Sequence, residues 1–147
     1  QTSTTPNSIA RSRTDRLRSL DTSVLARFLL GDDTNQFEMA ARLVSDPFWV
    51  SQTVWLELGW VLFKALNLPR ETVADMLQQI VSLETGQFEN APGIEWALSR
   101  FRDGADWADM IHLAASEGQA AGFATFDRKL ARSAGGSPPI PVETLRA

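Results

Sequence analysis

The chain has 147 residues, with 18 Asp and Glu against 14 Lys and Arg, one His and no Cys. Its length predicts a single domain, and the lack of cysteine excludes disulfides, thiol nucleophiles, Fe–S clusters and Cys-based zinc sites. The single histidine, His112, excludes a His-pair mechanism and a multi-His metal site within one chain. Any catalysis is therefore expected to rest on carboxylates, which recruit hard cations such as Mg²⁺ or Mn²⁺.

The formal net charge of -4 argues against a simple electrostatic nucleic-acid binder, which is usually basic. The charge is unevenly distributed, because residues 1–19 are basic and the rest of the chain is strongly acidic. A polyanionic partner would need a basic patch or a bound cation to offset that acidity. No stretch is apolar and long enough for a membrane span or a signal peptide, so a cytoplasmic location is expected.

Residues 1–16 are rich in Ser, Thr and Arg and are interpreted as a flexible leader before one folded domain, residues 17–147. Within that domain the expected strands cover residues 17–20, 48–51, 87–91, 122–126 and 140–142. The expected helices cover residues 23–30, with Thr22 as the N-cap, and then 34–44, 53–67, 70–83, 92–103, 106–119 and 127–134. Strands that alternate with helices predict an α/β domain with a central, mainly parallel sheet.

Two aspartates, Asp21 and Asp127, follow expected strands directly. In open parallel sheets the carboxyl ends of the strands form the ligand-binding crevice, so both residues are candidates for a functional site. Each of them, taken alone, is also explained as a cap of the helix that follows.

Glu57 is expected to project from the apolar face of the most apolar helix, without a basic residue within one turn. An unpaired buried carboxylate costs several kcal/mol, which favours a functional role over a distant salt bridge or an exposed polar strip. Asp103, Asp106 and Asp109 gather near one helix N-terminus, where the helix dipole offsets part of their repulsion. Asp109 is expected to point toward the interior. One bound cation would offset the repulsion among all these carboxylates.

These acidic positions lie within motifs that resemble one family. Leu20–Leu25 and Phe28–Asp33 look like the opening of a PIN domain of the VapC type, the toxins of bacterial toxin–antitoxin pairs. Thr53–Leu58 resembles the helix of that family with its single Glu. Asp106–Ala115 is similar to the third motif, and Thr125–Asp127 to the closing Thr-x-Asp. The resemblance extends from Leu20 to about Ala134, with the motifs in the expected order.

The resemblance implies a three-layer α/β/α fold and an endoribonuclease dependent on Mg²⁺ or Mn²⁺. Asp21, Glu57, Asp109 and Asp127 would form the acidic quartet that binds the metal, with Asp106 as a fifth candidate. The substrates implied are structured RNAs, tRNA among them. The partners implied are a VapB-type antitoxin, which also binds operator DNA, and a second copy of the chain in a homodimer.

In the mechanism that we expect, Asp21 and Asp109 ligate one ion, while Glu57 and Asp127 bind a second ion or act through water. Ser23 stands where the family often has Asn, and its hydroxyl would orient Asp21. Thr125 would orient Asp127 in the same way.

Other residues have expected roles in binding. Arg128, Lys129 and Arg132 would lead the RNA backbone to the metal, unless they only form a solvated helix face. The helices at 22–46 and 53–83 are expected to expose Phe37, Met39 and Trp55 as a groove for an antitoxin helix, although such stripes are more often core.

Two further interpretations remain open. The domain is either a catalytically idle PIN-like binding scaffold, against which the complete quartet argues, or a different carboxylate-metal phosphohydrolase. An Asp-x-Asp phosphatase would need an acid at position 23, where Ser23 stands.

Overall fold

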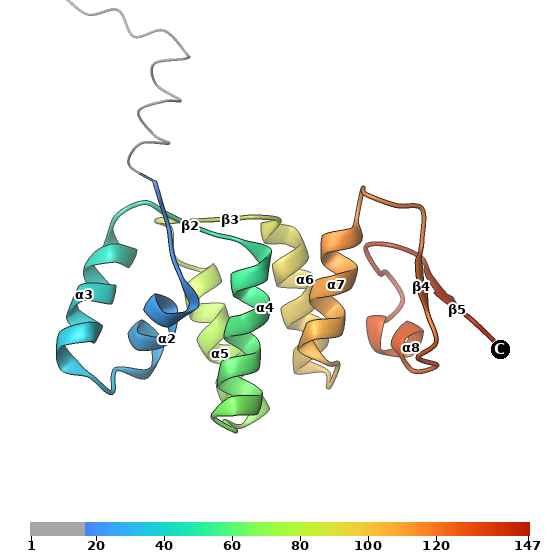
Figure 1. Cartoon of the computed structure of the whole chain (residues 1–147), viewed down its shortest axis with the longest axis horizontal. Coiled ribbons are helices and arrows are strands. Elements are labelled where there is room, and N and C mark those ends of the chain that lie inside the picture. Colours follow the sequence, from blue (N-terminus) through green and yellow to red (C-terminus); the bar gives the residue numbers. More distant parts are fainter. Residues whose placement is uncertain (1–16) are drawn as a thin grey trace, which may run out of the picture.

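The computed structural model describes residues 17–147, so the expected leader over residues 1–16 lies outside the described residues (Figure 1). The strands are β1 (Arg18–Ser19), β2 (Phe48–Val50), β3 (Gly86–Phe88), β4 (Phe123–Thr125) and β5 (Val142–Thr144). The helices are α2 (Thr22–Leu30), α3 (Thr34–Ser45), α4 (Gln52–Trp60), α5 (Arg70–Val81), α6 (Ala91–Arg102), α7 (Trp107–Ser116) and α8 (Leu130–Ala134). A π-helical segment, η1 (Val61–Ala65), continues α4.

Each expected element has a counterpart, and two helix starts differ for identifiable reasons. Asp21, not Thr22, is the N-cap residue of α2, because Thr22 is already helical and its hydroxyl bonds to Glu57. The helix expected from Asp127 begins only at Leu130. The Asp127 carboxylate accepts a hydrogen bond from the Lys129 N–H at 2.9 Å and holds a turn there.

The strands confirm the predicted α/β class with parallel pairing, and they are divided between two sheets. The first sheet has the order β1-β2-β3, with Arg18 opposite Phe48 and Phe48 opposite Gly86. The second sheet pairs β4 with β5, with Phe123 opposite Val142. The sequence predicts one central sheet, so this division is a feature that only the structure reveals.

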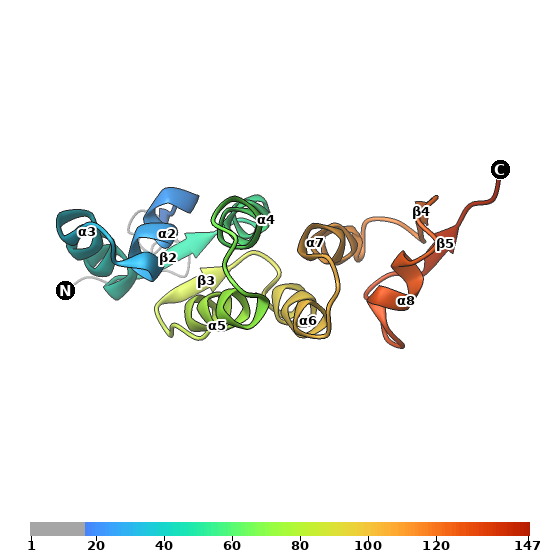
Figure 2. The same cartoon turned by 90° about the horizontal axis from the view of Figure 1, so that it is seen from below.

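The two sheets lie toward opposite ends of the molecule. In Figures 1 and 2 the β4–β5 sheet and α8 lie beyond α6 and α7, whereas α2 and α3 lie at the other end. The helices α4, α5, α6 and α7 pack between these ends, where α5 contacts α6, α6 contacts α7 and α7 contacts α4. None of the helices over residues 17–147 is long and apolar enough to cross a membrane.

The core is built from the apolar sides of these central helices and of β2. Phe48, Phe101 and Met110 are fully buried in it. Trp55 is also fully buried, packed edge-on against Phe88 with ring centroids 5.5 Å apart. The expectation that Trp55 lines an exposed groove is therefore wrong, because this face of α4 packs against β3.

Candidate active site

Asp21 lies where β1 ends and the chain turns into α2. Ser23 Oγ donates a hydrogen bond to Asp21 Oδ2 at 2.8 Å. The Ser23 hydroxyl, followed by the Thr22 and Ser23 backbone N–H groups, lowers the pKa of Asp21 below its ordinary 3.8 by stabilising the ionised form. Asp21 is therefore a carboxylate at neutral pH, which is the form that binds a cation.

Glu57 lies on α4 and faces the start of α2. The Thr22 hydroxyl donates a hydrogen bond to Glu57 Oε1. The prediction of apolar surroundings for Glu57 is wrong, because Glu57 is exposed while Trp55 and Leu58 turn into the core. Within residues 17–147 it also forms no ion pair, so the alternative of a distant salt bridge finds no support there.

Asp106 and Asp109 lie at the N-terminus of α7. Asp106 is the N-cap residue, and its Oδ2 accepts a hydrogen bond from the Asp109 N–H at 3.0 Å. Burial raises the pKa of Asp109 above its ordinary value, and the negative charges of Asp106 and Asp127 raise it further against a smaller opposing effect of His112. Asp109 is half-buried beside other acids, so a cation placed here would stabilise its charged form.

Asp127 follows β4 and is exposed. Thr125 Oγ1 accepts a hydrogen bond from the Asp127 N–H at 3.0 Å. Thr125 thus fixes the backbone at Asp127 and does not contact its carboxylate, which instead binds the Lys129 N–H. The expected orienting contact from the Thr125 hydroxyl to the acid is absent.

The four acids form two half-sites. Asp21 and Glu57 are brought together by the adjacent hydroxyls of Ser23 and Thr22. The second half-site holds Asp109 with Asp106 and Asp127, whose charges act on one another. The expectation that the aspartates after β1 and β4 share one crevice is not met within one chain, because these strands belong to different sheets.

A contact between α4 and α7 connects the two half-sites. Trp107 Nε1 donates a hydrogen bond to the Trp55 carbonyl oxygen at 2.9 Å, and both indole rings are buried. The Trp107 ring also lies against Gly59 so closely that a Cβ at this position has no room.

The chemistry of the donors suits a divalent cation, since hard ions prefer carboxylate oxygens. Their spacing in a single chain does not complete a site, because no three His, Asp or Glu residues of the described chain gather closely enough to hold a metal ion. Each half-site provides at most part of a coordination sphere.

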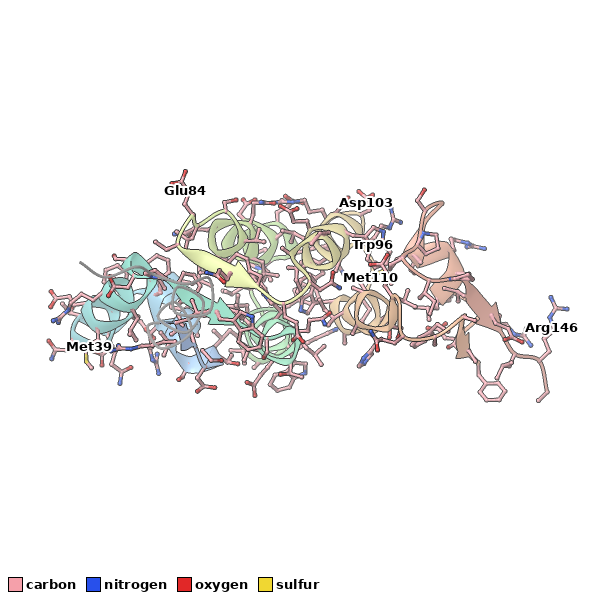
Figure 3. All side chains as sticks on the ribbon, turned by 90° about the horizontal axis from the view of Figure 1, so that it is seen from above. Met39, Glu84, Trp96, Asp103, Met110 and Arg146 are labelled. Carbon is pink, nitrogen blue, oxygen red and sulfur yellow. The ribbon has the colours of Figure 1, made fainter. Side chains whose placement is uncertain are left out.

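Two surfaces adjoin the half-sites. Arg128, Lys129 and Arg132 are exposed just beyond Asp127 and form no ion pair with any described residue. Next to the half-site of Asp21 and Glu57, α2 and α3 border a depression of about 330 Å³. It is lined by Ser23, Val24, Arg27, Gln36, Met39, Ala40 and Leu43. Figure 3 shows Met39 at the outer side of α3, where it is 62% exposed.

Sequence reasoning missed Thr22 and Glu89. Thr22 binds Glu57 across 35 positions, and no local pattern reports such a contact. Glu89 follows β3, and its Oε1 accepts a hydrogen bond from the Gln52 N–H at 2.9 Å, which supports the start of α4. The expected strand over residues 87–91 places Glu89 inside the strand, and only the observed end of β3 at Phe88 shows that Glu89 follows it.

Comparison with known proteins gives one match. A family model described as PIN domain matches residues 19–136, which is most of the chain. No curated protein and no solved structure matches it.

Proposed function

Because the chain belongs to the PIN domain family, a nuclease-type fold, we propose that it is a divalent-metal-dependent endoribonuclease acting as the toxin of a toxin–antitoxin pair. Its substrates would be structured RNAs, tRNA among them, and its site of action the cytoplasm. The observation that carries this proposal is the like-charge cluster of Asp106, Asp109 and Asp127, in which burial and neighbouring charges raise the pKa of Asp109. A divalent cation relieves that repulsion, and the family supplies the reaction class.

In this proposal Asp21, Glu57, Asp109 and Asp127 hold Mg²⁺ or Mn²⁺, with Asp106 as a further candidate. Such an ion supplies an activated water and neutralises charge on the phosphodiester. Ser23 keeps Asp21 ionised and fixed, and Thr22 holds Glu57 in place.

The neighbouring surfaces provide roles for the partners. The exposed cations Arg128, Lys129 and Arg132 would bind the RNA backbone next to Asp127. The depression between α2 and α3 would take a helix of a VapB-type antitoxin, with Met39 as an apolar contact. The protein would reach operator DNA only through that antitoxin.

The test is cleavage of total tRNA and of a structured RNA by the purified chain, with Mg²⁺, Mn²⁺ or EDTA, followed on denaturing gels. Wild-type protein should cleave with one of the ions and not in EDTA. Asp21→Asn and Glu57→Gln should each lower the rate by more than about 100-fold, beyond the effect typical of residues that only support metal ligands.

Glu84→Gln is the matched control, because Glu84 is an exposed acid before β3 whose side chain points outward from the molecule (Figure 3). It should cleave like wild type. Wild-type protein that cleaves neither RNA with either ion would refute the nuclease proposal and favour an idle binding scaffold. Growth arrest on expression, abolished by Asp21→Asn, tests the toxin role separately.

A further inference from the structure

Within residues 17–147 each sheet has two edge strands, β1 and β3 in the first sheet and β4 and β5 in the second. Of these four, β1 and β4 are the edge strands that lead directly into Asp21 and Asp127. In β1 the Leu20 N–H donates to the Trp49 carbonyl, so the N–H and C=O of Ser19 point to the free edge. In β4 the Phe123 N–H and the Thr125 C=O bond toward β5, so the backbone groups of Ala124 point to the free edge.

These directions restrict how the two edges fit together. In a parallel sheet, a residue whose N–H and C=O point toward the neighbouring strand lies opposite a residue whose own N–H and C=O point away from that strand. Ser19 therefore fits opposite Thr125, with its N–H donating to the Ala124 C=O and its C=O accepting from the Phe126 N–H. This register aligns the last residues of both strands and places Asp21 opposite Asp127.

We infer that β4 of one copy pairs with β1 of a second copy in this register. The three strands of one copy and the two strands of the other then form one continuous parallel sheet. The pairing brings Asp127 of one copy next to Asp21 of the other, so a complete acidic site contains residues from two chains. This role for the pairing rests on the proposed nuclease function, whereas the pairing itself does not.

The contacts of α8 favour a second copy, over the chain's own β1, as the partner of the β4 edge. Arg100 Nε on α6 donates to the Ser133 carbonyl at 2.9 Å, and the guanidinium packs against Gly135. Leu130, Ala134 and Ile140 are each at most 3% exposed. The β4–α8–β5 unit is thus attached to its own helices, and α4 and α7 separate it from its own β1 (Figures 1 and 2). A second copy reaches the β4 edge without breaking these contacts.

The side chains along the two edges also match. With Ser19 opposite Thr125, Phe126 falls beside Leu20, on the face of the sheet that carries Phe48 and Val50. Leu20, Phe48 and Val50 are buried, whereas Phe126 is 71% exposed, more than any other large apolar side chain described. Pairing therefore moves an exposed aromatic ring toward an apolar face.

The pairing is reciprocal when two copies are related by a two-fold axis. β1 of each copy then receives β4 of the other, which pairs the β1 and β4 edges of both copies and closes the assembly as a dimer. Unpaired parallel edges would otherwise remain open templates for aggregation.

Disulfide trapping tests the pairing directly, because the chain has no cysteine of its own. In the proposed register Arg18 lies opposite Ala124, at a separation that a disulfide spans. Arg18→Cys and Ala124→Cys chains, co-expressed with different tags and oxidised, should yield a cross-linked dimer that contains both tags. Light scattering should give the mass of a dimer for the wild-type chain.

The matched control combines Arg18→Cys with Glu143→Cys. Glu143 pairs with Ala124 from β5 and so lies one strand farther from β1, beyond disulfide reach. This pair should not cross-link, and neither single variant should cross-link alone. A monomeric wild type, or an Arg18→Cys/Ala124→Cys double variant that forms its disulfide within one chain, would overturn the inference. Neither result depends on nuclease activity, so failure of the pairing and failure of the proposed function are distinguishable.

Discussion

Asp109 is the carboxylate whose surroundings oppose its charge most clearly. Burial raises its pKa, and Asp106 and Asp127 add to the shift. A carboxyl with a raised folded-state pKa makes the folded state lose stability as the pH rises from the ordinary value through the folded-state value. Asp109 therefore reduces stability at neutral pH, a cost that the proposed metal ion would offset.

Asp109→Asn removes this penalty and should raise the Tm at neutral pH in EDTA, as followed by circular dichroism. The difference from wild type should vanish well below pH 3.8, the ordinary value for Asp, where the wild-type side chain is protonated as well. Added Mn²⁺ should raise the Tm of wild type more than that of the variant, since only a folded state that binds the ion is stabilised. Glu84→Gln should not alter the Tm, and a lower Tm for Asp109→Asn at neutral pH would contradict the assignment.

The sequence predicts the surroundings of a residue when its partners are close in the chain. Ser23 lies two positions from Asp21, and its hydroxyl contacts that acid as the motif suggests. The surroundings of Glu57 depend on Thr22, 35 positions away, and on which face of α4 packs against the core. Helical periodicity predicts the helix but not the direction in which Glu57 points, because the helix is apolar on most sides.

The packing of α4 against α7 is the contact that holds the two half-sites together. Gly59 lets the Trp107 ring lie directly on the α4 backbone, where its Nε1–H reaches the Trp55 carbonyl. Gly59→Ala should push the helices apart and lower the free energy of unfolding by about 1–3 kcal/mol, the usual cost of overpacking a core. Denaturant unfolding measures this loss.

Gly136→Ala is the matched control for this change. Gly136 has open space around its Cβ position and an ordinary backbone φ, so the extra methyl group should leave stability nearly unchanged. Equal stability of the two variants would show that the close approach of Trp107 to Gly59 does not limit the packing of α4 and α7.

Strands are predictable as elements in this chain, but their pairing is not. Phe48–Val50 follows a proline and is apolar, and Phe123–Thr125 follows a glycine, so each is expected from local composition. Which edges meet depends on the backbone directions at Ser19 and Ala124 and on the attachment of α8 to α6. These are long-range features, so a single central sheet is the natural expectation from sequence, whereas the chain itself carries two.

The whole molecule combines an acidic surface with a proposed polyanionic substrate. Part of the net charge of -4 belongs to the carboxylates of the half-sites, and cations bound there would neutralise it. If the complete site spans two chains, each chain contributes one half-site to each of two sites. Two chains with substitutions in different half-sites can then complement each other in a mixed dimer, whereas two chains with substitutions in the same half-site cannot.

Co-expression of Asp21→Asn with Asp127→Asn chains should therefore restore RNA cleavage to about a quarter of the wild-type rate, because about half of the dimers are mixed and each has one intact site. Asp21→Asn with Glu57→Gln is the matched control and should stay inactive, since both lesions fall in the same half-site and every site keeps one of them. Rates are compared at equal total protein for the unseparated mixture, and the mixed dimer isolated through two different tags should reach about half of the wild-type rate. Activity that fails to return in the first mixture, while wild type cleaves normally, would place the whole quartet within one chain.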